Sequence, residues 1–170
     1  HPALFTVARP ICPPEAADWP SDCKQPLYWV ARGRVTPPAP RSAHVLLAAD
    51  RHYQLFLNGR RLARQRNFVN GDQYLFAQQW EIPAACLAER EWTFEVVLRS
   101  DPWRCKNHRR FRPVLLTEIA VTHSTGTSLF GTNMEWETAV VEDWRETLDA
   151  ASIPKIPYEC VRVPVSDGAI

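Results

Sequence analysis

Apolar and polar side chains alternate with a period of two along much of the chain. In residues 92–99 (WTFEVVLR) every second position from Trp92 to Leu98 is apolar, which is typical of a half-buried β-strand. No stretch repeats its apolar residues with the 3.6-residue period of a helix beyond two turns. The pattern predicts strands over residues 27–35, 43–49, 53–57, 60–64, 74–82, 92–99, 114–122, 128–131 and 135–141. Residues 83–89 are expected to form one short helical segment, because Pro83 suits a first helical position.

The dipeptide Asn58-Gly59 directly separates two of these strands. Both residues tolerate a positive φ angle, as the tight two-residue turn of an antiparallel hairpin requires. We therefore expect residues 53–57 and 60–64 to pair as a hairpin. Several short strands separated by turns predict an all-β protein with an antiparallel jelly-roll β-sandwich.

Both ends of the chain are rich in proline. Proline at this density blocks helices and central strands, so residues 1–26 are expected to lie extended over the domain surface. Residues 149–170 lack a periodic apolar face and are interpreted as a linker toward a missing downstream domain. The sandwich is accordingly expected to span residues 27–148. The chain begins with His1 rather than Met, which favours a fragment of a larger protein.

The composition is that of an ordinary globular domain. A length of 170 residues fits one domain, and a net charge of +1 gives no overall attraction to nucleic acid or membrane. No apolar run approaches the roughly 20 residues of a membrane span. The 5 cysteines contain no CxxC pair, which argues against a zinc ribbon or a complete disulfide framework. Cys12 and Cys23 could form a bridge in an exported chain, but reduced cysteines, which we favour, indicate a cytoplasmic location over a periplasmic or secreted one.

Sequence motifs of catalysis are absent. The chain has no GxSxG elbow, no GxxxxGK[ST] phosphate loop and no HExxH motif. Glycoside hydrolysis needs two carboxylates across a sugar bond, and no pattern pairs the acidic side chains considered for that role. Those side chains are Asp50, Asp72, Asp101, Glu118 and Glu135. Cys105 and His108 lack the second ligand pair that zinc normally requires, so no metal or cofactor is expected.

Aromatic residues in loops indicate a different kind of site. An exposed ring can stack on the C–H face of a sugar while neighbouring amides meet its hydroxyl groups. The loop candidates are Trp103, Phe68 and Trp136, with Asn67 and Asn133 beside them. For each of these rings a packing role competes with sugar binding. The tryptophans inside predicted strands, Trp29, Trp80 and Trp92, are expected in the core.

The loop 101–112 carries a dense run of positive charge. Its basic side chains are Arg104, Lys106, Arg109, Arg110 and Arg112. Such a run could grip the phosphates of a nucleic acid or the acid groups of an anionic polysaccharide. The near-neutral chain favours the simpler interpretation, a solvated loop or one that forms salt bridges to neighbouring domains.

Two segments resemble a known family. Residues 43–59 (AHVLLAADRHYQLFLNG) are similar to the sugar-binding-like jelly roll at the start of many glycoside hydrolases. The later segment PVLLTEIAVTHSTGTSLFGTNMEWETA looks like the N-terminal, galactose-binding-like domain of bacterial α-L-rhamnosidases. In that family a Gly turn is followed by a Gly-Thr-Asp-like triplet and a tryptophan, which here are Gly131-Thr132-Asn133 and Trp136. Asn133 departs from the usual Asp, and the basic loop 101–112 is a second departure.

The resemblance implies a non-catalytic accessory module of a larger rhamnosidase-like enzyme. Similar enzymes keep their catalytic carboxylates in a separate helical barrel, so the partners implied are the other domains of the parent enzyme. The module would support the catalytic domain and either hold glycan or act only as architecture. The alternative is a stand-alone binding module for anionic glycan or nucleic acid that uses residues 104–112. The third hypothesis is an independent enzyme. No membrane role is expected.

Overall fold

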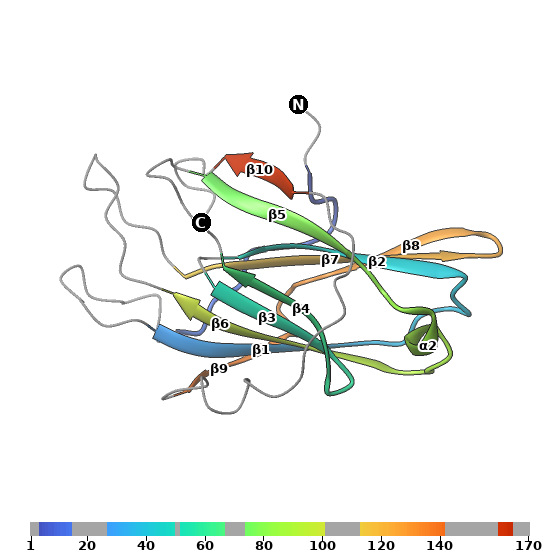
Figure 1. The fold of residues 1–170 in the computed structure, drawn as a ribbon, viewed down its shortest axis with the longest axis horizontal. Helices are drawn as coiled ribbons and strands as arrows, with labels where there is room; N and C mark the ends of the chain where they lie inside the picture. The colour runs from blue at the N-terminus through green and yellow to red at the C-terminus, as the bar shows by residue number, and fades with distance from the viewer. Residues whose placement is uncertain are drawn as a thin grey trace.

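The computed structural model describes residues 4–14, 27–49, 52–66, 74–100, 113–141 and 160–164. Within these ranges ten strands form two five-stranded antiparallel sheets (Figure 1). We call them the β1 sheet, with strand order β4-β3-β6-β1-β9, and the β2 sheet, with order β10-β5-β2-β7-β8. The predicted antiparallel jelly-roll β-sandwich is confirmed.

The chain passes repeatedly from one sheet to the other. The β1 sheet contains β1 (Leu27–Val35), β3 (His52–Leu57), β4 (Arg60–Arg66), β6 (Trp92–Ser100) and β9 (Glu137–Val141). The β2 sheet contains β2 (Ser42–Ala49), β5 (Tyr74–Glu81), β7 (Leu115–His123), β8 (Gly126–Gly131) and β10 (Cys160–Pro164). The short helix α2 (Ala84–Leu87) lies between β5 and β6 in the chain. Strands distant in sequence therefore become neighbours, as where β6 lies between β1 and β3.

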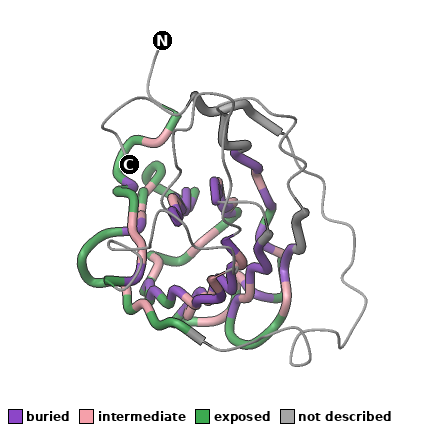
Figure 2. Tube along the Cα trace, turned by 90° about the vertical axis from the view of Figure 1, so that its left-hand side faces the viewer, coloured by how far each residue is buried: buried purple, intermediate pink, exposed green. Residues whose placement is uncertain are grey.

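The inward-facing residues of the two sheets form one core (Figure 2). Trp29 and Trp92 are fully buried and Trp80 is nearly so, as expected for tryptophans within strands. Each indole N–H has a partner, since Trp29 donates to Ser100 Oγ at 3.0 Å and Trp92 to the Cys86 carbonyl at 3.1 Å. Trp80 donates to the Tyr53 hydroxyl at 3.1 Å. Burial of these polar atoms thus carries little desolvation cost.

The predicted hairpin joins β3 and β4 and is confirmed. Asn58 and Gly59 have φ angles of 48° and 75°, the left-handed values that the turn requires. The Asn58 side chain accepts a hydrogen bond from the Thr93 amide at 2.7 Å and donates to the Glu91 carbonyl at 2.9 Å. Its amide also contacts the Glu89 carboxylate. The same asparagine therefore forms the turn and fixes the start of β6.

The described part of the N-terminal segment, residues 4–14, lies against the β2 sheet. The buried Glu118 carboxylate on β7 accepts hydrogen bonds from three successive backbone amides, Thr6 at 2.7 Å, Val7 at 2.6 Å and Ala8 at 3.2 Å. Further along, Ile11 and Leu115 exchange two backbone hydrogen bonds of 3.0 Å. These contacts join the start of the chain to the sandwich.

Most strand boundaries lie within one or two residues of the sequence prediction. Strand β8 begins at Gly126 rather than at residue 128. Strand β9 begins at Glu137 rather than at 135, because the turn at Asn133 holds Glu135. Strand β10 was not predicted, and it pairs with β5 inside the segment 149–170 interpreted as a linker. The sandwich therefore takes in a strand beyond residue 148. Continuation of the chain into a further domain stays a prediction.

Candidate functional site

An open pocket lies at one edge of the sandwich, where β1 runs beyond its partner β9. The last β1–β9 pair is Arg32 with Glu137, so residues 33–35 have no β9 neighbour. The pocket has a volume of about 400 Å³, and we call it the edge groove. Its walls come from the N-terminal segment, β1, β8 and the β8–β9 turn. The lining residues are Val7, Arg32, Arg34, Val35, Leu129, Phe130, Gly131, Asn133, Glu135, Trp136 and Glu137.

Trp136 forms part of the inner wall of the groove. It is half-buried and packs against the core, and its ring occupies the space above Gly33 of β1. A Cβ atom at position 33 would lie 2.1 Å from Trp136 Cε2, far closer than any real contact. Glycine is therefore required here for the close approach of the indole to the strand. Packing against Gly33 therefore fixes the position of the indole without any ligand.

Asn133 organises the turn that carries Trp136. Its side-chain oxygen accepts a hydrogen bond from the Glu135 amide at 2.9 Å, and its carbonyl accepts one from the Trp136 amide at 3.2 Å. This is the local turn bonding expected of an Asn in that position. Asn133 is exposed and lines the groove together with Trp136.

Gly131 and Thr132 bind the N-terminal segment to this turn. A Cβ atom at Gly131 would lie 2.7 Å from Ala8 Cα, so the two backbones touch. The buried Thr132 hydroxyl donates to the Arg9 carbonyl at 2.7 Å and accepts from the Thr117 amide at 3.2 Å. Gly131 and Thr132 are thus engaged in packing against the N-terminal segment, whose Val7 lies in the groove wall.

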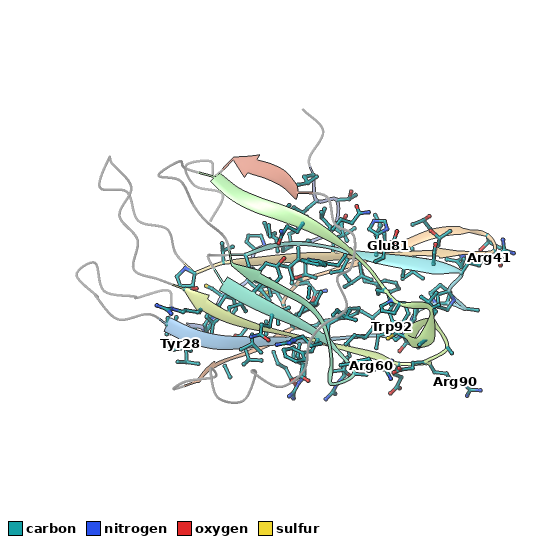
Figure 3. All side chains as sticks on the ribbon, viewed as in Figure 1. Tyr28, Arg41, Arg60, Glu81, Arg90 and Trp92 are labelled. Atoms are coloured by element: carbon teal, nitrogen blue, oxygen red, sulfur yellow. The ribbon has the colours of Figure 1, made fainter. Side chains whose placement is uncertain are left out.

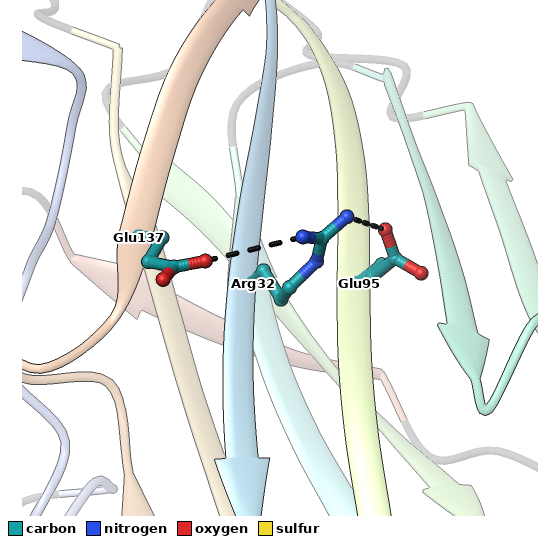
Figure 4. A network of polar contacts seen from close by, with 3 residues as sticks. All are labelled: Arg32, Glu95 and Glu137. Atoms are coloured by element: carbon teal, nitrogen blue, oxygen red, sulfur yellow. Dashed lines mark hydrogen bonds and ion pairs between the residues drawn. The ribbon is translucent and has the colours of Figure 1, made fainter.

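Three charged side chains cross the strands beside the groove (Figure 4). Arg32 lies between Glu95 and Glu137, with nitrogen–oxygen distances of 2.9 Å and 3.9 Å. The hydrogen bond that Arg32 donates to the Glu95 carboxylate raises the pKa of Arg32, which stays protonated. All three groups are substantially exposed, so their contribution to stability is small. Their effect is to hold Arg32 and Glu137 in place and to cancel their charge.

Arg34 differs from Arg32 two positions earlier on the same strand. It is exposed, lines the groove and forms no ion pair with any residue in the described ranges. Its guanidinium can offer up to five N–H donors. The opposite part of the lining is apolar, with Val7 and Leu129 exposed by 39% and 38%. The groove therefore combines an apolar surface with donors and acceptors.

The structure brings two of the predicted site residues together, Trp136 and Asn133. The other sugar-binding candidates, Trp103, Phe68 and Asn67, lie outside the described residues. So does the whole basic run Arg104, Lys106, Arg109, Arg110 and Arg112. Sequence reasoning missed Val7 and Arg34, and the only available signal was that Arg34 follows Gly33 near the end of a predicted strand.

The acids considered for catalysis do not lie together in the part of the chain that the structure describes, although Glu135 lines the groove with Glu137. Of the acids considered, Glu118 is buried and engaged by three amides, and Glu135 lies in the groove. Asp50, Asp72 and Asp101 fall outside the described residues. Within the described ranges no three His, Cys, Asp or Glu side chains gather as a metal site would require. No helix there is long and apolar enough to cross a membrane.

Comparison with known proteins finds the same fold in solved structures but no match in sequence. No protein-family model matches the chain. No curated protein matches its sequence. Among solved structures, the GH78 family rhamnosidase of Bacillus sp. GL1 matches 79% of this chain with a TM-score of 0.59 and 20% identity.

Two further α-L-rhamnosidases share the fold. The enzyme of Dictyoglomus thermophilum matches 67% of this chain with a TM-score of 0.57 and 14% identity. The enzyme of Streptomyces avermitilis, solved with L-rhamnose, matches 73% with a TM-score of 0.53 and 14% identity. The chain spans only 12–13% of the length of these three enzymes. The chain thus has the fold of a short part of α-L-rhamnosidases, as the sequence resemblance predicted.

Proposed function

We propose that this chain is a non-catalytic accessory module of a larger α-L-rhamnosidase-like glycoside hydrolase. It supports the catalytic domain of that enzyme and presents a surface for glycan. The observation that carries the proposal is the extent of the likeness. Three rhamnosidases match most of this chain with only about an eighth of their own length.

The chemistry of the described residues supports the same assignment. The most buried carboxylate, Glu118, accepts three backbone hydrogen bonds and serves to hold the N-terminal segment. Hydrolysis of a glycosidic bond needs a second carboxylate opposite the first, across the scissile bond. The large side chains between the sheets are taken up by packing, and a packed core offers no cavity for a substrate.

The test compares this chain with the full-length gene product. We expect the full-length protein to release p-nitrophenol from p-nitrophenyl α-L-rhamnoside, and the 170-residue chain alone to give no rate above background. The full-length protein should also contain a helical domain with paired carboxylates. Hydrolysis by the isolated chain, or a full-length product without any hydrolase domain, would contradict the proposal.

A further inference from the structure

We infer that the edge groove binds one neutral pyranose residue, an inference that rests on the proposed function and specifies its glycan-contacting surface. The groove has the size for such a ligand. Small-molecule sites typically enclose roughly 300–1,000 Å³, and the groove measures about 400 Å³. It therefore suits a single ring at the end or side of a glycan rather than a long segment of chain.

One wall of the groove matches the apolar face of a sugar ring. Trp136 provides the aromatic surface, and Val35 and Leu129 extend the apolar lining. The contact of Trp136 with Gly33 fixes the indole in advance. A ring that is already immobilised loses little conformational entropy when a ligand stacks on it, which favours binding.

The polar part of the groove supplies both kinds of hydrogen-bonding group that hydroxyls need. Arg34 and the Asn133 side-chain NH2 group contribute donors, and Glu135 contributes acceptors. A hydroxyl group donates one hydrogen bond and accepts others, so it can use donors and acceptors together. A purely basic or purely acidic pocket would leave half of that capacity unmet.

The charges of the lining favour an uncharged ligand. Arg32 and Arg34 are balanced by Glu135 and Glu137, so the lining has no formal net charge. Glu95, which lies outside the lining, also forms an ion pair with Arg32 and adds one negative charge beside the groove. A phosphate or a uronate would find no excess positive charge here, and its desolvation would go uncompensated.

The experiment titrates the 170-residue chain with methyl α-L-rhamnoside and methyl β-D-glucoside, followed by calorimetry and by saturation-transfer NMR. D-glucuronate and inorganic phosphate serve as charged probes. We expect at least one neutral glycoside to bind in the millimolar range, with an affinity that changes less than about twofold between low and physiological salt. The charged probes should bind more weakly.

Arg34→Ala is the decisive variant, because Arg34 is exposed and its loss leaves the core intact. Loss of a charged donor should weaken neutral glycoside binding about tenfold. Arg41→Ala is the matched control, since Arg41 is exposed at the start of β2 and is not part of the groove lining (Figure 3). It should bind within about twofold of the parent chain. Circular dichroism on both variants shows that folding is unchanged.

Two results would overturn the inference. One is no binding of either neutral glycoside at tens of millimolar, or an equal affinity of the Arg34 and Arg41 variants. The other is preferential, strongly salt-dependent binding of glucuronate or phosphate, which would make the groove an anion site. Failure of the inference is separable from failure of the proposed function. A full-length hydrolase whose groove binds no sugar would refute only the inference, whereas a sugar-binding groove in a protein without a hydrolase domain would refute only the proposed function.

Discussion

Trp92 and Trp136 pack against the same core but differ in exposure. Trp92, beside α2, is fully enclosed, meets Phe94 edge-to-face at a centroid distance of 6.1 Å and donates its N–H to the Cys86 carbonyl (Figure 3). Trp136 is half-exposed on the edge groove and rests on a glycine. The difference teaches where binding can occur. The polar atom of Trp92 is bonded internally, whereas Asn133 and Arg34 in the lining beside Trp136 are exposed.

The largest effect should follow removal of the enclosed ring. Trp92→Ala is expected to lower the free energy of unfolding by about 3–5 kcal/mol, because it opens a cavity in a packed core. Trp136→Ala should cost less, about 1–2 kcal/mol, because part of its ring is already in water. Urea denaturation followed by circular dichroism measures both. Equal losses would place Trp136 in the core as firmly as Trp92 and contradict the comparison.

A change at Gly33 should disturb the groove end without removing any ring. Gly33→Ala places a methyl group on the indole of Trp136 and is expected to cost about 1–3 kcal/mol. In a Trp136→Ala background the same change should cost much less, since the obstructing ring is gone. Thermal or urea denaturation of the four proteins in this cycle gives the coupling energy. Additive losses would mean that Gly33 matters for a reason other than the indole.

Removal of either turn asparagine should lower the free energy of unfolding, and the loss should be larger at Asn58 than at Asn133. Asn58→Ala is expected to cost about 1–2 kcal/mol, because alanine tolerates the positive φ poorly and the bonds to Thr93 and Glu91 are lost. Asn133→Ala loses only the bond to the Glu135 amide and should cost about 0.5–1 kcal/mol. Denaturation midpoints of the two variants test this order, which would be reversed if the groove turn were the more rigid one.

The smallest effect is expected for the charged row beside the groove. Arg32→Ala should change the free energy of unfolding by less than about 1 kcal/mol, because its partners are exposed and screened. The difference between variant and parent should shrink further at high salt. Denaturation at two salt concentrations measures it. A large loss that persists in salt would give Arg32 a packing role instead.

The regular part of the fold could be predicted because its signals are local. Alternation in residues 92–99 and the turn at Asn58-Gly59 depend on neighbours in the chain, and both are confirmed. Strand β10 was missed because its alternation is too short, with only Val161 and Val163 flanking Arg162 in a proline-rich segment, and the strand forms by pairing with β5. Its existence depends on a partner that the local sequence does not specify.

The edge groove could be predicted only in part. Trp136 and Asn133 were candidates because an aromatic and an amide occur near a glycine turn. The packing of Trp136 on Gly33 and the position of Val7 in the groove wall depend on contacts between segments far apart in the sequence. Such contacts cannot be inferred from a single sequence, so Arg34 was interpreted as an ordinary exposed residue of a strand.

The hold of Glu118 on the first residues has a practical consequence for anyone who shortens the protein. Beginning the polypeptide at β1 would leave a buried anion stripped of its three amide donors. It would also uncover the stretch of β7 at Leu115 that Ile11 now pairs with, and a bare strand edge recruits other molecules. The truncated protein should aggregate and be proteolysed faster than the intact one, although every strand of the sandwich would still be present.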